Sequence, residues 1–231
     1  MIKVKNLSKI YGTGETECKA LNNVNLEIGD TDIVSVTGPS GSGKSTFLNV
    51  ISTLDSPTEG EIVFDSINIS SLSEKKNAEF RLENFGFIFQ DFYLISTLNV
   101  KENIMLPINY KSKNYDKRLF DDLVEKCGLK NKLLNYPHEL SGGEQQRVAI
   151  CRALLMKPKV IFADEPTGNL DSRNSQIVFD LLISYARNTR SCLIYVTHEE
   201  KFAKLADCHI RVLDGECKMC NDDTETEENA K

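Results

Sequence analysis

The chain has 231 residues, enough for one large domain with a substantial core or for two small lobes folded together. Hydrophobic residues make up 40% of it and charged residues 27%, which is ordinary for a globular protein. A net charge of −6 argues against a nucleic-acid binder, which usually presents a basic face. The sequence has no run of 18 apolar residues and no signal-peptide pattern at its start. We therefore expect a cytoplasmic protein.

The cysteines and the last residues give little sign of function. The seven cysteines lack the regular spacing of a disulfide framework, which agrees with a reducing compartment. Cys217 and Cys220 are the only close pair, and a zinc site would need further cysteines or histidines nearby, so we interpret the pair as fortuitous. Residues 221–231 hold five acidic residues and almost nothing apolar. We predict a domain over residues 1–215 and an acidic, disordered tail over residues 216–231.

The first predicted elements are strands of a half-exposed sheet. Apolar and polar side chains alternate in residues 2–4, 24–28 and 61–64, as in an antiparallel sheet with one solvated face. We therefore assign residues 1–30 and 58–72 to an antiparallel β subdomain.

Three short apolar segments are typical of fully buried strands. They are residues 33–37, 160–163 and 192–196. Helix-forming residues follow the first of them, from Lys44 to about Leu54. Helical spacing then dominates residues 91–158, which we interpret as a helical subdomain inserted between two strands. The sequence thus predicts an α/β fold with a mostly parallel core sheet, which carries the β and helical subdomains.

The segment after the first buried strand matches G-x-x-x-x-G-K-[ST] at every fixed position. Its glycines allow backbone N–H groups to converge on phosphate oxygens, and the following helix adds the positive end of its dipole. Lys44 is expected to reach the β- and γ-phosphates, and the Ser45 hydroxyl to hold Mg²⁺. A dinucleotide fingerprint fails, because Thr46 stands in place of its third glycine. The predicted binding residues here are Gly38, Ser40, Gly41, Ser42, Gly43, Lys44, Ser45 and Thr46.

Chemistry on a phosphate also requires a carboxylate near the metal and a group that orients the attacking water. Asp164 and Glu165 follow a buried strand directly, and open α/β sheets bind ligands at the carboxyl ends of their strands. Asp164 is therefore the expected metal carboxylate and Glu165 the expected base. His198 follows the next buried strand, where it is either a structural histidine or a contact to the γ-phosphate.

A second anion-binding helix start is predicted at Ser141, Gly142 and Gly143, where small residues precede a helix from Glu144. One chain with two such sites requires an explanation. The simplest is a head-to-tail dimer, in which this segment closes over the ATP that is held by the other copy.

The segment Leu140 to Ile150, LSGGEQQRVAI, closely resembles the signature of the ABC ATPases, and the other motifs occur in the expected order over residues 1 to 215. The resemblance implies a P-loop NTPase of the ABC nucleotide-binding type that uses ATP and Mg²⁺. It also implies that Tyr11 stacks on adenine and that Gln90 links the metal site to a membrane partner. Asp171 matches the loop that crosses the dimer interface, and His198 matches the switch histidine. The implied metal-binding set is Ser45, Gln90 and Asp164, and the implied catalytic set is Glu165, His198 and Gln90.

Within the family, residues 54–58, 87–107 and 166–172 resemble the lipoprotein-release and macrolide-exporter group, with cell-division ATPases as near neighbours. The resemblance implies a second copy of the chain and a transmembrane permease-like partner with a large extracytoplasmic domain. It places the chain on the inner face of the cell membrane through that partner. Export, lipoprotein release and force transmission all stay open. Phe92 and Tyr93 either line a groove for a helix of the partner or pack the helical subdomain.

Two other functions are weighed against this one. A soluble ABC ATPase that acts on ribosomes or DNA would carry two nucleotide domains or a long coiled coil, and neither occurs in this sequence. A regulatory subunit that binds ATP without cleaving it conflicts with the intact pair Asp164 and Glu165. The sequence therefore predicts an active ATPase.

Overall fold

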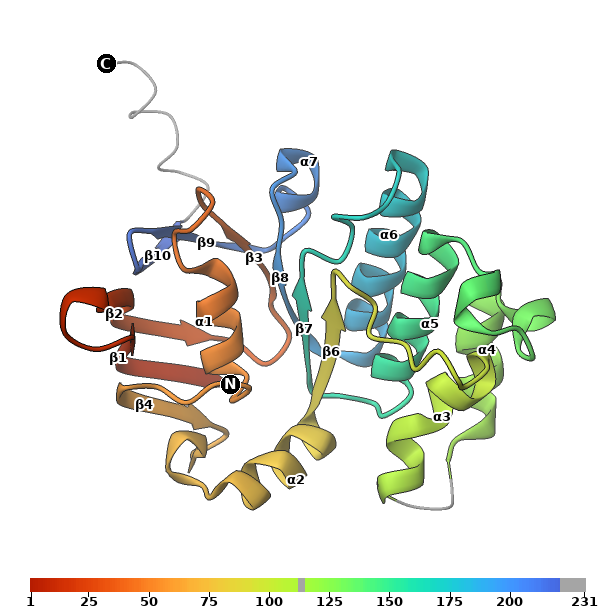
Figure 1. The fold of residues 1–231 in the computed structure, drawn as a ribbon, viewed down its shortest axis with the longest axis horizontal. Helices are drawn as coiled ribbons and strands as arrows, with labels where there is room; N and C mark the ends of the chain where they lie inside the picture. Colours follow the sequence, from red (N-terminus) through yellow and green to blue (C-terminus); the bar gives the residue numbers. More distant parts are fainter. Residues whose placement is uncertain (112–114, 221–231) are drawn as a thin grey trace. The chain divides into compact units, whose positions relative to one another are not determined.

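A computed structural model describes residues 1–111 and 115–220, which separate into two compact units. The first unit comprises Met1–Asn77 together with the chain from Val196 onward, and the second comprises Ala78–Tyr195. Figure 1 shows the elements of both units along the chain. Among the described residues, none of the helices combines the length and the hydropathy that a membrane crossing requires.

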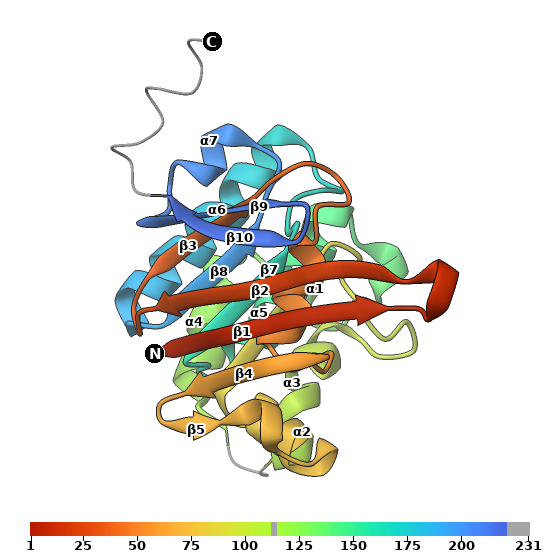
Figure 2. The ribbon, with the colours of Figure 1, turned by 90° about the vertical axis from the view of Figure 1, so that its left-hand side faces the viewer.

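The first unit contains an antiparallel sheet in the strand order β2-β1-β4-β5 (Figure 2). Its strands are β1 (Ile2–Tyr11), β2 (Cys18–Ile28), β4 (Glu59–Phe64) and β5 (Ile67–Asn68). Val4 of β1 lies opposite Leu26 on one side and Ile62 on the other, and all three side chains are buried. Neighbouring strands therefore bury the same face of the sheet, and the predicted antiparallel β subdomain is confirmed.

A second group of strands in the first unit carries the glycine-rich segment. β3 (Ile33–Thr37) pairs in parallel with β9 (Cys208–Leu213), which pairs with β10 (Glu216–Cys220) in antiparallel fashion. Helix α1 (Lys44–Ile51) follows β3 and packs on β1 and β2, whereas the short helix α7 (Glu200–Ala203) precedes β9. The glycine-rich segment thus joins a buried strand to a helix, as the motif requires.

The predicted acidic tail begins too early. Asp214 and Gly215 connect β9 to β10 with φ angles of 48° and 79°, the two positive values that a type I′ hairpin turn needs. Cys217 is buried in this hairpin, and burial raises the pKa of its thiol to about 12. The prediction of a disordered tail is therefore wrong for Glu216–Cys220, which form a strand. Residues 221–231, the rest of the predicted tail, lie outside the described residues.

The second unit is built on β6 (Phe85–Phe89), β7 (Val160–Asp164) and β8 (Cys192–Val196), and β7 lies between the other two. β6 and β7 run in parallel, with Phe87 opposite Phe162, and their rings stack with centroids 5.7 Å apart. β7 and β8 are buried along almost their whole length because helices cover the sheet, which is typical of parallel sheets. The predicted strands at 160–163 and 192–196 are confirmed.

Helices make up most of the second unit (Figure 1). They are α3 (Val100–Lys111), α4 (Lys117–Lys126), α5 (Gly142–Leu154) and α6 (Ser172–Thr189), with α2 (Glu74–Asn84) leading into it from the first unit. The short 3-10 helices of the chain are η1 (Gly14–Thr16), η2 (Ile69–Ser71), η3 (Lys130–Lys132) and η4 (Pro137–Glu139). α3, α4 and α5 fall inside the predicted helical segment, and α4 buries Leu123 as its apolar spacing predicts. α2 was not predicted because it buries no residue and so has no apolar periodicity.

Candidate functional site

The glycine-rich loop of the first unit has a backbone that only glycine can adopt. Gly38, Gly41 and Gly43 have φ angles of 149°, 77° and 108°. A Cβ on Gly43 would lie 2.4 Å from the carbonyl oxygen of Ala20, and one on Gly38 would lie 2.1 Å from that of Val212. Two of the glycines are therefore required both by their conformation and by the close approach of neighbouring strands.

The start of α1 offers groups that fit a phosphate. The side chain of Lys44 is buried at 5% exposure, and its Nζ atom donates to the carbonyl oxygens of Gly38 (3.1 Å) and Pro39 (2.8 Å), so the ammonium lies over the loop. The buried Ser42 Oγ atom has no hydrogen-bond partner. The helix starts at Gly43 without a side-chain cap and without an acidic residue in its first turn. An anion at this helix start would be stabilised by these groups and by the dipole.

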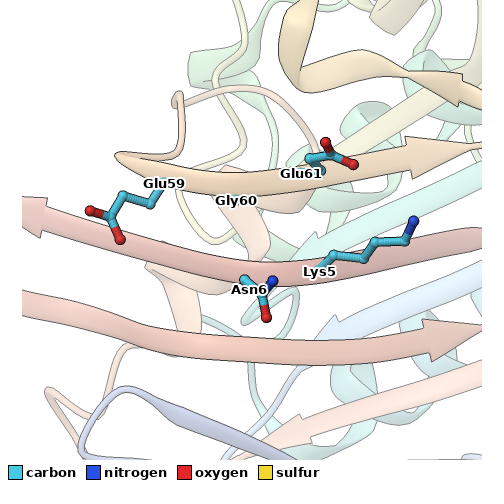
Figure 3. Close-up of a pocket in the computed structure, with 5 residues that line it drawn as sticks. All are labelled: Lys5, Asn6, Glu59, Gly60 and Glu61. Carbon is cyan, nitrogen blue, oxygen red and sulfur yellow. The ribbon is translucent and has the colours of Figure 1, made fainter.

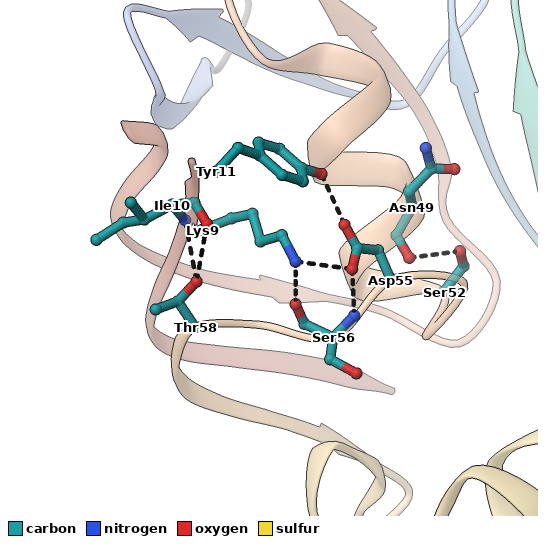
Figure 4. A network of polar contacts seen from close by, with 8 residues as sticks. All are labelled: Lys9, Ile10, Tyr11, Asn49, Ser52, Asp55, Ser56 and Thr58. Atoms are coloured by element: carbon teal, nitrogen blue, oxygen red, sulfur yellow. Dashed lines mark hydrogen bonds and ion pairs between the residues drawn. The ribbon is translucent and has the colours of Figure 1, made fainter. Parts of the chain in front are cut away.

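Tyr11 lies in a polar network at the end of β1 (Figure 4). Its hydroxyl donates to Asp55 Oδ2 (2.7 Å) and forms a hydrogen bond with Thr46 of α1. Lys9 donates to Asp55 Oδ1 (2.7 Å) and to the carbonyl oxygen of Ser56 (2.7 Å), and its Nζ atom lies 4.8 Å from the centre of the Tyr11 ring. Burial and the Asp55 hydrogen bond raise the pKa of Tyr11. The ring is thus a neutral, anchored aromatic surface, 42% exposed, next to the phosphate loop.

We expect Asp55→Ala to weaken ATP binding about fivefold, since loss of the hydrogen bond that anchors Tyr11 costs about 1 kcal/mol. The dissociation constant of a fluorescent ATP analogue measures this. Glu61→Ala, which removes an exposed carboxylate elsewhere in the first unit, is the control and is expected to bind ATP as the wild type does. Equal affinities for Asp55→Ala and Glu61→Ala would show that the network does not support the nucleotide site.

In the second unit, β6 and β7 end at the same edge and bring three predicted residues there. Phe89 pairs with Asp164 in the parallel register, so Gln90 and Glu165 follow at the same level. Glu165 has a φ angle of 46°, which is uncommon for a residue with a side chain. The strand ends therefore place Gln90, Asp164 and Glu165 together, as the sequence predicts for open α/β sheets.

The loop after Glu165 is tied to Gln90. Gln90 Nε2 donates to Asn169 Oδ1 (3.2 Å), and Asn169 Nδ2 donates to the carbonyl oxygen of Gln90 (3.2 Å). A Cβ on Gly168 would lie 2.7 Å from Gln90 Nε2, so the loop approaches the glutamine closely because it carries glycine there. Gly142 of α5 lies against Asn169 as well, which brings the signature segment to the same group.

Ser141, Gly142 and Gly143 form the start of α5. Ser141 Oγ accepts the backbone N–H of Glu144 (3.3 Å), and Glu144 Oε2 accepts the backbone N–H of Ser141 (2.8 Å), which together make a capping box. The hydrogen bond from the Ser141 backbone lowers the pKa of Glu144. The predicted helix start is therefore observed two residues earlier than expected, with Ser141 as its cap.

Two further residues of α5 support this group and were missed in the sequence. Gln146 is fully buried and donates through Nε2 to the carbonyl oxygens of Phe89 (3.3 Å) and Pro166 (2.6 Å), so it joins the ends of β6 and β7. Arg152 donates to the carbonyl oxygens of Phe92 (2.7 Å) and Tyr93 (2.6 Å). A buried glutamine and an arginine on a helix are ordinary in a sequence, and only their distant partners reveal what they hold.

His198 belongs to the first unit, next to the phosphate loop along the chain fold. The backbone N–H of Thr197, directly before it, donates to the carbonyl oxygen of Val36 (3.3 Å), two residues before Gly38. The residues on which the predicted roles rest are therefore grouped in two sets. Tyr11, residues 38–46 and His198 lie in the first unit, and the remaining predicted residues lie in the second.

A shallow pocket also lies where β1 pairs with β4 (Figure 3). It is lined by Lys5, Asn6, Glu59, Gly60 and Glu61. Gly60 has a φ angle of 92°, and a Cβ on it would lie 2.4 Å from the carbonyl oxygen of Asn6, so the hollow follows from a bulge in the strand pairing. None of the predicted site residues contributes to this pocket.

Comparison with known proteins agrees with this fold and these motifs. Residues 21–168 match the family model described as ABC transporter, and the chain belongs to that family. It is 48% identical to an ABC transporter ATP-binding protein of Methanocaldococcus jannaschii, over 94% of this chain and 97% of the relative. It is 42% identical to the lipoprotein-releasing system ATP-binding protein LolD 2 of Chlorobaculum tepidum, over 95% of this chain and 92% of the relative.

A solved structure is equally close. The ATP-binding cassette MJ0796 of Methanocaldococcus jannaschii, in a dimeric post-hydrolysis state bound to ADP and Pi, matches with a TM-score of 0.88 and 38% identity. The match covers 96% of this chain and 98% of that structure. The chain is thus an ATP-binding and ATP-hydrolysing subunit of the ABC transporter class. These relatives do not favour the alternative of an ATPase that acts on ribosomes or DNA.

Proposed function

We propose that two copies of this chain close head-to-tail around two ATP molecules and that hydrolysis reopens them. In each site one copy supplies Tyr11 and the loop of residues 38–46, and the other supplies Ser141, Gly142 and Gly143 with Asp171 nearby. The observation that carries the proposal is the start of α1, where a buried lysine, an unpartnered Ser42 hydroxyl and an uncapped helix fit a triphosphate. The dimeric state of the cassette MJ0796 supports the pairing of copies.

Hydrolysis depends on the residues at the ends of β7 and β6. Glu165 orients and deprotonates the attacking water, and His198 contacts the γ-phosphate. Ser45, Asp164 and Gln90 are the residues that would hold Mg²⁺, which neutralises phosphate charge in this chemistry. Hydroxyl, carboxylate and amide oxygens are the ligands that Mg²⁺ takes, so these side chains fit it. The hydrogen bonds between Gln90 and Asn169 hold this glutamine at the strand end, from which it links the metal to the partner.

The motion is delivered to a membrane protein that docks at Phe92 and Tyr93. Tyr93 is 62% exposed although Arg152 binds its backbone, so the segment presents an aromatic surface on a fixed backbone. This docking places the chain on the inner face of the membrane. Similarity to a lipoprotein-releasing subunit supports a partner with a large extracytoplasmic domain, for lipoprotein release, export or force transmission.

The test is to express tagged Glu165→Gln in the native cell, solubilise the membranes with ATP and Mg²⁺, and identify the proteins that co-purify. We expect a membrane protein with a large extracytoplasmic domain. A double variant with Phe92→Ser and Tyr93→Ser should still bind ATP but recover much less of that protein, whereas Tyr110→Ser, an 80% exposed tyrosine of α3, should recover it fully. Ribosomal or DNA-bound proteins without a membrane partner would contradict the proposal.

A further inference from the structure

Asn174, in the first turn of α6, joins two of the segments that the proposed dimer uses. Its backbone N–H donates to Asp171 Oδ1 (2.9 Å) and its Nδ2 atom donates to Asp171 Oδ2 (2.7 Å), so both carboxylate oxygens of the helix cap are engaged. These two hydrogen bonds lower the pKa of Asp171. The Asp171 carboxylate is therefore fixed by Asn174 rather than turning freely at the surface.

The same amide lies against the signature segment. A Cβ placed on Gly143 would lie 2.4 Å from Asn174 Oδ1 and 3.1 Å from Nδ2, so the glycine backbone contacts the amide directly. Gly143 is buried by this contact, whereas Ser141 is exposed. The absence of a side chain at Gly143 thus serves packing within the chain as well as the approach of a phosphate.

Arg147 holds the asparagine in this orientation. Its Nη1 atom donates to Asn174 Oδ1 (3.0 Å), and its Nε atom donates to the carbonyl oxygen of Cys127 (2.9 Å) at the end of α4. Because the guanidinium is planar, these two bonds set the direction of the Nη1 donor. With Oδ1 fixed by Arg147, the Nδ2 group of the amide points to Asp171.

We infer that Asn174 is a positioning residue that makes the signature turn and the Asp171 loop one rigid surface, and that ATP-driven closure of two copies depends on it. The inference rests on the proposed head-to-tail dimer. Two segments that move independently would each lose conformational freedom when the copies close, and this loss would weaken the dimer. Asn174 removes that loss in advance, because it ties the segments together in the single chain.

The test measures ATP-dependent dimerisation by sedimentation velocity, in protein that carries Glu165→Gln to prevent hydrolysis. Adding Asn174→Ala should raise the protein concentration needed for half-dimerisation about tenfold or more, because each of the two interfaces loses its fixed geometry. Binding of a fluorescent ATP analogue to the single chain should stay unchanged. The control is Asn188→Ala on the same helix, whose amide donates to Ser184 Oγ (3.3 Å), and it should dimerise as the parent does.

A second variant separates positioning from general loss of stability. Asn174→Asp keeps the size of the side chain and the acceptor for Arg147 but replaces the donor to Asp171 with a carboxylate oxygen. It should dimerise poorly at pH 8 and recover as the pH falls towards 5.5, since protonation of the new carboxyl restores a donor. The parent, measured in parallel, should show no such recovery.

The outcomes distinguish the inference from the proposed function. If Glu165→Gln alone stays monomeric with ATP and Mg²⁺, the proposed dimer itself is wrong. If it dimerises and both Asn174 variants dimerise equally well at every pH, the dimer stands and the positioning role is overturned. If Asn174→Ala does not fold, the pH dependence of Asn174→Asp decides between the two readings of the residue.

Discussion

Replacing Glu165 with glutamine should lower the rate of ATP hydrolysis about 100-fold or more while leaving ATP binding intact. A positioned general base contributes about 10²- to 10⁴-fold to a rate, and glutamine keeps the size of the side chain but cannot accept the proton. Glu165 lies at the end of β7 with a φ angle of 46°, and glutamine can keep that backbone because the substitution changes one terminal atom group. Phosphate release at saturating ATP measures the effect.

The control for this prediction is Glu79→Gln, which removes an exposed carboxylate from α2. Its hydrolysis rate should match that of the wild type. A Glu165→Gln protein that retains more than a tenth of the wild-type rate would mean that another group activates the water, and Asp164 would then be the first residue to examine.

Gly43→Ala should abolish measurable ATP binding at micromolar nucleotide. The φ angle of 108° at this position costs any residue with a side chain about 1–3 kcal/mol. The added methyl group would also lie 2.4 Å from the carbonyl oxygen of Ala20, so either the loop or β2 must move. Since Lys44 and α1 start at this glycine, the movement displaces the groups that fit the phosphates.

Gly14→Ala provides the matched control for that variant. Gly14 lies in the same unit and also has a positive φ angle, 61°, but a Cβ there would meet open space. It should lose a little thermal stability and bind ATP normally. If both variants bind ATP equally well, the close approach at Gly43 is not what shapes the phosphate loop.

Much of the fold and the class of protein followed from local patterns in the sequence. The strands predicted at residues 33–37 and 192–196 are observed with the same bounds, because fully buried strands are short apolar runs that end where polar residues begin. The phosphate loop was also predictable, since its chemistry requires glycines and a lysine at fixed neighbouring positions. The strand Glu216–Cys220 was within reach of the same reasoning, because Asp214 and Gly215 are a strong hairpin turn signal.

The sequence by itself therefore determined the α/β class, the phosphate loop, the signature helix and the membership of an ATP-hydrolysing family. Only the tertiary structure decided which side chains hold these motifs in place. Asp55 lies 44 positions after Tyr11, Arg152 lies 60 positions after Phe92, and Asn174 lies 27 positions after Arg147. Such hydrogen bonds join residues that are brought together by packing, and their spacing along the chain follows no period. A periodic pattern records burial, whereas a polar contact between distant segments leaves no trace until the chain is folded.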